Sequence, residues 1–139
     1  MVKAVWVSEK DSEELAIIKE IMRGVMESEN VSAGSSCILV YADGVPVAAG
    51  VMDTAGAYGG AIKLGPVAVL EDYRRQRLGG LVMRMMVRRA YELGYNTQYV
   101  LSPPESAEFF RPLGFTRTNG GQYGLIKLKR EGDITGHCG

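Results

Sequence analysis

A cluster of positive charge stands directly before two glycines in the stretch YRRQRLGG. Arg74, Arg75 and Arg77 precede a helical pattern, although the amino end of a helix already carries partial positive charge. Gly79 and Gly80 would each cost a first helical turn roughly 1 kcal/mol relative to alanine. Both features become favourable if a pyrophosphate binds there, because free backbone N–H groups, the helix dipole and the arginines all attract an anion. The stretch therefore predicts a phosphate cradle.

The positive charge is local to this part of the chain. The 139 residues contain 16 basic and 16 acidic side chains, so the net charge is zero and gives no support for a polyanionic partner. Six arginines nevertheless lie between Arg74 and Arg89, with no acidic residue between Tyr73 and Tyr91. A nucleic-acid-binding domain is the weaker alternative, because no aromatic-interleaved basic surface is evident. We expect a small anionic ligand, with no nucleic-acid and no membrane partner.

Length and composition predict one folded domain in residues 1–130, followed by a loose tail in residues 131–139. The hydrophobic fraction of 46% and the charged fraction of 23% are typical of globular proteins. Cys37 and Cys138 are far apart, and neither they nor His137 have metal-ligand spacing, so a reducing compartment and no metal are expected. With no leader and no apolar run near ~20 residues, the predicted location is cytoplasmic.

Hydrophobic periodicity predicts the elements that must position the cradle. The expected order is strand 3–7, helix 11–26, a hairpin in 37–52, strand 61–70, helix 78–93, strand 97–101, helix 105–113 and a final hairpin in 115–130. Asp43-Gly44 is a strong signal for the first hairpin turn, and Asn119-Gly120-Gly121 separates the strands of the last hairpin. Pro66 cannot donate a ladder hydrogen bond, so its strand should be bulged or lie beside a gap.

The cradle resembles motif A of the Gcn5-related N-acetyltransferase (GNAT) superfamily, whose pattern is Arg/Gln-x-x-Gly-x-Gly/Ala. Arg74 and Gly79 match this pattern, whereas Arg77 replaces the first glycine. The stretch AEFFRPLGF, from Ala107 to Phe115, resembles motif B, usually written A-x-x-F-Y-x-x-x-G-F. The predicted order of elements is also the order of that superfamily, so the resemblance extends over about residues 3–130.

The resemblance implies a single-domain α/β (α+β) GNAT acyl-CoA N-acyltransferase fold. Its mixed, mostly antiparallel sheet would be flanked by helices, and strands 61–70 and 97–101 would splay apart to hold acetyl-CoA. Backbone groups of Val67, Ala68 and Val69 would bind the pantetheine arm and the thioester carbonyl. The residues expected around the pyrophosphate are Arg74, Arg75, Gln76, Arg77, Leu78, Gly79 and Gly80, with Phe110 on the wall of the cofactor site.

The resemblance further implies direct acetyl transfer, in a ternary complex, to a primary amine of a small molecule or a peptide. Many members place a tyrosine as general acid at the position of Phe110, which has no proton to give. Ser102, Tyr99, Tyr95 and Tyr123 are the alternative donors. The thiolate could also leave unaided, since its conjugate acid has a pKa of roughly 8.5 by analogy with cysteine. The remaining alternative is a catalytically weak acyl-CoA-binding module.

The acceptor and the assembly state have no readable signal in the sequence. In the superfamily, loops equivalent to ESENVSAGSS, DTAGAYGG and TNGGQYG surround the acceptor pocket, and none of the three stretches contains a motif that defines an acceptor. The final hairpin could pair between two subunits, which would give a homodimer.

Overall fold

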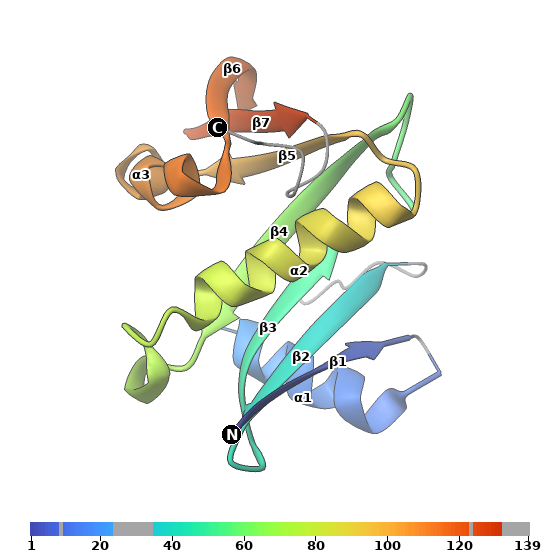
Figure 1. Ribbon diagram of the computed structural model, residues 1–139, viewed down its shortest axis with the longest axis vertical. Helices are drawn as coiled ribbons and strands as arrows, with labels where there is room; N and C mark the ends of the chain where they lie inside the picture. The colour runs from blue at the N-terminus through green and yellow to red at the C-terminus, as the bar shows by residue number, and fades with distance from the viewer. Residues whose placement is uncertain (9, 24–34, 123, 132–139) are drawn as a thin grey trace.

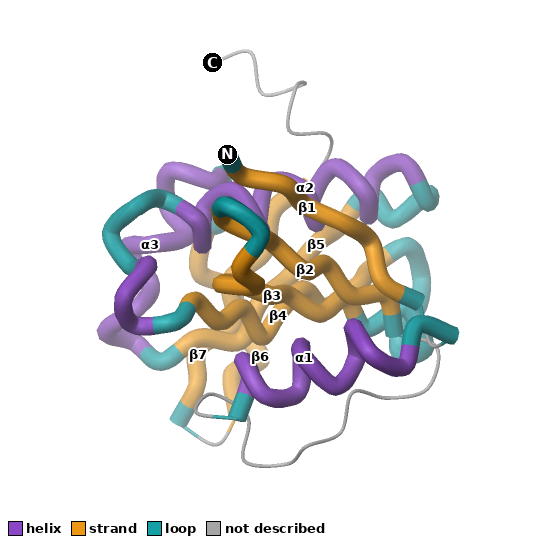
Figure 2. Tube along the Cα trace, turned by 90° about the horizontal axis from the view of Figure 1, so that it is seen from below, coloured by secondary structure: helices purple, strands orange, loops and turns teal. Residues whose placement is uncertain are grey.

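The computed structural model describes residues 1–8, 10–23, 35–122 and 124–131, which form a seven-stranded sheet with helices on both faces (Figures 1 and 2). The strand order is β1-β2-β3-β4-β5-β7-β6, and every neighbouring pair is antiparallel except the parallel pair β4 and β5. The expected α/β class and mixed, mostly antiparallel sheet are therefore confirmed. The strands are β1 (Val2–Val7), β2 (Ser36–Ala42), β3 (Val45–Met52), β4 (Ala61–Val69), β5 (Thr97–Ser102), β6 (Thr116–Gln122) and β7 (Leu125–Glu131). The helices are α1 (Ser12–Met22), α2 (Leu78–Glu92) and α3 (Ala107–Phe110).

The turn between β2 and β3 has the predicted geometry. Asp43 and Gly44 have φ angles of 49° and 83°, and positive φ at both central residues is the signature of the tight turn that matches the twist of two antiparallel strands. β1 pairs with β2 on the other side, so the first three strands form one antiparallel unit.

The two faces of the sheet bury separate apolar clusters. On one face, α1 covers a cluster that includes Ile18, Met22, Cys37, Leu39 and Ala68. Burial raises the pKa of the Cys37 thiol to about 11, so this thiol stays protonated and unreactive at neutral pH. The opposite face is covered by α2, whose buried residues are Leu78, Val82, Met83, Met86, Val87 and Ala90.

Strands β4 and β5 separate after a short paired segment. Only residues 61–63 of β4 pair with residues 97–99 of β5, although β4 continues to Val69 and β5 to Ser102. Pro66 has no N–H to donate beyond this point, and Gly65 has a φ of +103°, a conformation that favours glycine. The predicted irregularity at Pro66 and the predicted splay of the two strands are both confirmed.

The segment predicted as one helix over residues 105–113 is instead three short pieces. A 3-10 turn at Pro104–Ser106 leads into α3, and a second 3-10 turn follows at Arg111–Leu113. Pro112 explains the break, because a proline inside a helix removes a hydrogen bond and its ring collides with the carbonyl four residues earlier. Gly114, with a φ of +91°, ends the segment as predicted.

The final hairpin reverses later than the sequence predicted. Gln122 pairs with Leu125, so Asn119–Gly121 lies within β6, where the pairing with β7 shifts between Thr118 and Gln122. A Cβ at Gly121 would lie 2.3 Å from the carbonyl oxygen of Leu125, so the approach of the two backbones requires glycine there. Asn-Gly-Gly therefore encodes a strand irregularity rather than the turn itself.

The predicted boundary between the folded domain and the loose tail lies at the end of this hairpin. The predicted tail began at Glu131, which is wrong because Glu131 is the last residue of β7. Residues 132–139, which include His137 and Cys138, lie outside the described residues, as does Tyr123. Among the helices that the structure describes, none has the length and apolarity needed to cross a membrane.

A buried polar pair joins β5 to β7 beneath α2. Gln98 is 0% exposed and Arg130 is 7% exposed, and the Arg130 Nη1 group donates a hydrogen bond of 3.1 Å to the Gln98 Oε1 atom. The Gln98 amide nitrogen donates in turn to the carbonyl oxygen of Tyr95 at 2.6 Å. Both groups of the Gln98 amide are therefore satisfied, as burial requires.

Close packing of α2 on β3 depends on Gly50. A Cβ at Gly50 would lie 2.5 Å from the Val82 Cγ1 atom, which belongs to a stiff, fully buried side chain. Gly50→Ala should therefore lower the free energy of unfolding by about 1–3 kcal/mol, the usual cost of overpacking. Chemical denaturation measures the change. Gly80→Ala is the control, since a Cβ there meets only the Arg84 Nη1 atom at 3.4 Å, and it should not destabilise the protein. Equal stability of Gly50→Ala and wild type would contradict this account.

Candidate functional site

A cavity of ≈ 600 Å³ opens where β4 and β5 part, and we call it the β4–β5 cavity. Its walls come from both strands, from α2, which crosses in front of the sheet, and from the turn before α3 (Figure 1). The lining residues are Leu64, Gly65, Pro66, Val67, Ala68, Val69, Arg74, Gly79, Met83, Val100, Leu101, Ser102, Pro103, Ser106, Phe109 and Phe110. A mainly apolar cleft with a few polar groups at its edges is typical of a ligand site.

The amino end of α2 lies at one end of the β4–β5 cavity. The first helical hydrogen bond runs from the Leu81 N–H to the Arg77 carbonyl at 3.1 Å, so the N–H groups of residues 78–80 have no acceptor within the helix. In the described structure no side chain caps this end. The Arg74 Nε group donates to the Val69 carbonyl oxygen at 3.0 Å, which fixes the turn against the end of β4. Unpaired N–H groups and the helix dipole can bind an anion here.

Gly79 is not required by the fold itself. Its φ is helical, and a Cβ there would meet only the side chains of Phe109, at 3.4 Å from Cζ, and Val69, at 3.8 Å from Cγ2. These are ordinary contact distances, so an alanine would fit and would suit a helix better. Glycine at this position leaves room for another group to approach the backbone from the cavity.

The structure brings together seven of the predicted site residues. Val67, Ala68, Val69, Arg74, Gly79, Phe110 and Ser102 all line the β4–β5 cavity. Leu78 buries its side chain in the core, so only its backbone is available to a ligand. Gly80 stands in the first turn of α2 with its N–H unpaired in the helix, and Arg75, Gln76 and Arg77 are exposed on the turn just outside the lining.

Two hydroxyl groups lie in the cavity near Phe110. The buried Ser102 hydroxyl donates to the Pro103 carbonyl oxygen at 2.8 Å. Ser106 was not predicted as a site residue; it stands four positions before Phe110, a spacing that places two residues on one face of a helical turn. This spacing was the sequence signal from which Ser106 could have been predicted as a site residue. Phe109, which the sequence suggested only as a core or wall residue, lies at the cavity beside Gly79.

Tyr99 and Tyr95 are not brought to the cavity. Val100 faces the core under α2, so the neighbouring Tyr99 points to the opposite face of the sheet. There the Lys127 Nζ atom lies 4.6 Å from the centre of the Tyr99 ring. Burial, followed by the negative charge of Asp53, raises the pKa of Tyr99 above its ordinary value. Tyr95 packs against the core at the end of α2.

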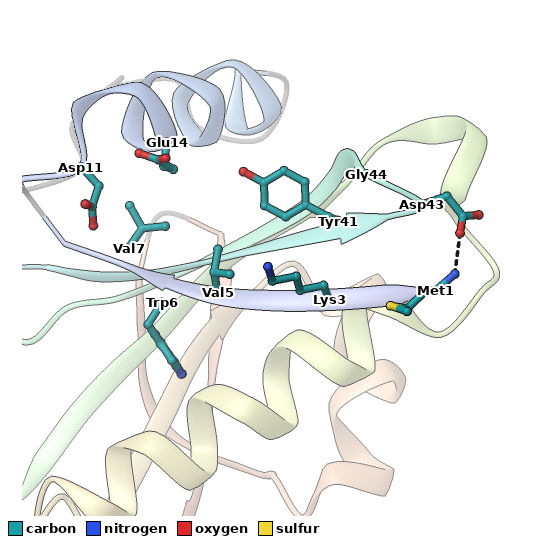
Figure 3. A pocket seen from close by; sticks show the side chains of 10 residues that line it. All are labelled: Met1, Lys3, Val5, Trp6, Val7, Asp11, Glu14, Tyr41, Asp43 and Gly44. Atoms are coloured by element: carbon teal, nitrogen blue, oxygen red, sulfur yellow. Dashed lines mark hydrogen bonds and ion pairs between the residues drawn. The ribbon is translucent and has the colours of Figure 1, made fainter.

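A second cavity of ≈ 590 Å³ lies between β1 and the start of α1, on the side of the sheet away from α2 (Figure 3). Lys3 and Val5 of β1 point into it, whereas Trp6 points toward α2, where Arg89 lies 5.5 Å from its ring centre. Asp11, just before α1, and Glu14 of α1 face it from the other side. None of the predicted site residues that the structure describes lines this cavity, so we do not assign the chemistry to it.

Comparison with known proteins identifies the family of this fold. The model of the acetyltransferase (GNAT) domain matches residues 33–117, which include β2 to β5, the cradle and the whole of motif B. The chain belongs to the GNAT acetyltransferase family. A search of curated protein sequences gave no significant match.

Solved structures share the GNAT fold over nearly the whole chain. A candidate N-acetyltransferase from Lactobacillus plantarum has a TM-score of 0.76 at 13% identity, covering 94% of this chain and 97% of that chain. The ribosomal-protein-S18-alanine N-acetyltransferase from Escherichia coli has a TM-score of 0.73 at 17% identity, covering 99% and 98%. The PaiA N-acetyltransferase from Thermoplasma acidophilum, solved in complex with coenzyme A, has a TM-score of 0.70 at 9% identity, covering 94% and 99%. At these identities the likeness establishes the fold alone.

The residue at which this chain departs from GNAT motif A has an unusual backbone conformation. Arg77 replaces the first glycine of the motif and has a φ of +64°, the left-handed conformation that favours glycine. Arg75, two positions earlier, has a φ of +68°. Each costs a non-glycine residue roughly 1–2 kcal/mol, and such conformations concentrate at ligand sites, where neighbouring contacts hold them. This GNAT protein therefore has, at the position of the motif's first glycine, a backbone conformation that favours glycine.

The ionisation of Tyr99 tests the surroundings of this residue. Since burial is the main cause of its raised pKa, Tyr99 should form tyrosinate only at higher pH than free tyrosine, and Asp53→Asn should remove a smaller part of the shift. The difference in near-ultraviolet absorbance between wild type and Tyr99→Phe during an alkaline titration isolates this residue. A Tyr99 titration at or below the pH of free tyrosine would contradict the described burial.

Proposed function

We propose that this GNAT protein transfers the acetyl group of acetyl-CoA to a primary amine of a small molecule or peptide, within a ternary complex. The observation that supports this most strongly is the position of the β4–β5 cavity, which runs from the gap between two parting strands to the glycine-bearing amino end of α2. An apolar cleft that ends at an anion-binding helix end suits a long ligand with a pyrophosphate at one end.

The chain's own residues would divide the binding of acetyl-CoA between them. Backbone groups of Val67, Ala68 and Val69 would bind the pantetheine arm, since β4 has no strand partner on the side of the gap. The unpaired N–H groups at Gly79 and Gly80 would bind the pyrophosphate, together with the arginines of the cradle. The space left at Gly79 supports this assignment, because a side chain there would occupy the route of approach.

The proposed reaction needs a neutral amine and a stabilised oxyanion. The amine nitrogen attacks the thioester carbonyl carbon, a C–N bond forms, the C–S bond breaks, and coenzyme A leaves as the thiolate. An alkyl amine with a pKa near ~10 is mostly protonated at neutral pH, so its proton must pass to a base or a water chain. Backbone N–H groups near residues 67–69 would stabilise the oxyanion, which is usually the largest contribution to such catalysis.

A group other than Phe110 must protonate the leaving thiolate, because a phenylalanine side chain has no proton to give. Ser102 and Ser106 supply hydroxyls in the same cavity, although the Ser102 hydroxyl already donates to the Pro103 carbonyl. Ser106 has no such bond among the described residues. We therefore favour Ser106 as the donor, with Ser102 as the second candidate. A thiolate leaving group needs only modest assistance, because its conjugate acid has a pKa of roughly 8.5.

Substitution of Gly79 tests the pyrophosphate assignment. Gly79→Glu should abolish coenzyme A binding in isothermal titration calorimetry, because its carboxylate would stand where the pyrophosphate approaches, while the fold survives. Gly79→Ala should raise the free energy of unfolding by roughly 1 kcal/mol and still weaken binding. Gly80→Ala adds similar helix stability and keeps the backbone N–H that we assign to the pyrophosphate; because Gly80 does not line the cavity, its methyl group should weaken binding less than that of Gly79→Ala. If Gly79→Glu binds coenzyme A with the affinity of wild type, the pyrophosphate does not bind at Gly79.

The proton donor is tested by three single variants. Ser106→Ala should lower kcat about 10-fold or more if its hydroxyl protonates the thiolate, with coenzyme A affinity unchanged, and Ser102→Ala should have a smaller effect. Phe110→Tyr, which restores the motif's hydroxyl, should raise kcat at similar affinity. Release of coenzyme A thiol measures all three. If neither serine variant changes kcat, the thiolate leaves unaided.

The alternative function is a catalytically weak acyl-CoA-binding module, motivated by Phe110. Binding of coenzyme A without turnover over a broad panel of amines and polyamines would favour it. A cytoplasmic location and a homodimer paired through the final hairpin stay predictions.

A further inference from the structure

A groove of ≈ 460 Å³ follows the irregular part of the β6–β7 hairpin, and we call it the β6–β7 groove. Among the described residues of its lining, two are cationic and none is acidic. Three of its residues are glycines, which leave backbone groups open to a ligand. The lining residues are Arg117, Thr118, Asn119, Gly120, Gly121, Gly124, Leu125, Ile126 and Lys127.

The groove lies one strand away from the β4–β5 cavity. Lys127 of β7 pairs directly with Leu101 of β5, and Ile126 pairs with Ser102. Leu101 and Ser102 line the cavity, whereas Ile126 and Lys127 line the groove. Because paired strands are about 4.8 Å apart, a small molecule can reach both places at once.

The structure holds Lys127 in place without neutralising it. Its Nζ atom lies over the Tyr99 ring at 4.6 Å from the centre, a contact that orients an ammonium group but leaves its charge. A Cβ at Gly120 would lie 3.4 Å from the Lys127 Cδ atom, an ordinary contact distance, so the lysine side chain lies directly beside Gly120. Asp53 lies near enough to raise the pKa of Tyr99, but within the described chain no ion pair joins any carboxylate to Lys127.

Lys129, two residues further along β7, provides the contrast. It points to the same face of the sheet as Lys127, since side chains alternate along a strand. Its Nζ atom forms an ion pair of 3.4 Å with the Glu131 carboxylate. Arg117 also has no ion pair within the described chain, but it pairs with Leu128, which is buried on the α2 side, so its side chain leaves β6 on the face opposite to Lys127. Of the two lysines on this face of β7, Lys127 is therefore the one whose charge no described carboxylate neutralises.

We propose that the acceptor is an amine that also carries a carboxylate or a phosphate group. Lys127 binds the anionic group in the β6–β7 groove while the amine faces the thioester across the β5–β7 pair. This inference rests on the acetyl transfer proposed above and adds a substrate class to it. The groove thereby discriminates against neutral amines and polyamines.

Matched substrate pairs test the inference. Each pair has one anionic and one neutral member: an amino acid with its amide, and phosphoethanolamine with ethanolamine. In wild type kcat/KM should be higher for the anionic member, and the two pairs together tell a carboxylate from a phosphate. Lys127→Met should lower kcat/KM for the anionic member about 10- to 100-fold, mainly through KM, and leave the neutral member unchanged. Lys127→Arg should restore part of the loss.

Lys129→Met is the matched control, because it removes a lysine from the same strand and face that is already paired with Glu131. It should leave the preference for anionic amines intact. Coenzyme A affinity, measured by calorimetry, should be the same in wild type and both methionine variants. Equal use of neutral and anionic amines by wild type would overturn the inference while leaving the proposed acetyl transfer in place.

Failure of the proposed function gives a different result. If coenzyme A binds but no amine is acetylated, calorimetric titration of the coenzyme A complex with the same amines decides the inference. Binding of the anionic members that is lost in Lys127→Met supports it, and absence of such binding overturns it.

Discussion

The separation of two parallel strands is the constraint on which the rest of the structure depends. A sheet normally satisfies every backbone N–H and carbonyl group between its strands, yet β4 and β5 pair over residues 61–63 and 97–99 alone. Beyond that point β4 keeps its bonds to β3 on one side, and its other edge faces the cavity. Pro66 lessens the cost of the gap, since it has no N–H that would need a partner. An extended ligand can supply the hydrogen bonds that a neighbouring strand would otherwise make.

A gap in the middle of a sheet has to be bridged elsewhere, and α2 does so. Its buried residues join one continuous cluster with residues of β3, β4 and β5. Two glycines set its position in opposite ways: Gly50 on β3 is needed because Val82 packs directly on it, whereas Gly79 at the helix end is free of such crowding. The first glycine serves helix packing, and the second leaves space that the protein alone does not fill.

The sequence predicted those parts of the fold in which a local signal agrees with the long-range packing. Asp43-Gly44 defined a hairpin, and Gly94, with a φ of +96°, ended α2 close to where periodicity placed its end. The prediction failed where one local sequence signal is compatible with two different structures. Asn-Gly-Gly supports either a turn or a strand irregularity, and the close approach to Leu125, which only the folded hairpin creates, decided between them.

The candidate site was predictable to the extent that it consists of a motif. The predicted cradle and the end of β4 are close together in sequence, so one motif predicted both residues 67–69 and residues 74–80. The opposite wall comes from Ser102, Ser106 and Phe109, whose arrangement depends on how the broken helix folds against the splayed strands. Tyr99 was a reasonable candidate by residue type and lies on the wrong face, because one step along a strand reverses the direction of a side chain.

The buried hydrogen bond between Gln98 and Arg130 fixes the register in which β7 pairs with β5. If β7 slid by one residue along β5, Arg130 would move to the open face and Lys129 would be forced beneath α2, leaving the Gln98 amide without its partner. Such a slip would also carry Lys127 away from Leu101. The buried Gln98–Arg130 pair, on the α2 side of the sheet, therefore fixes the position of Lys127 beside Leu101 on the opposite side. The proposed reaction depends on this spacing between the β4–β5 cavity and the β6–β7 groove.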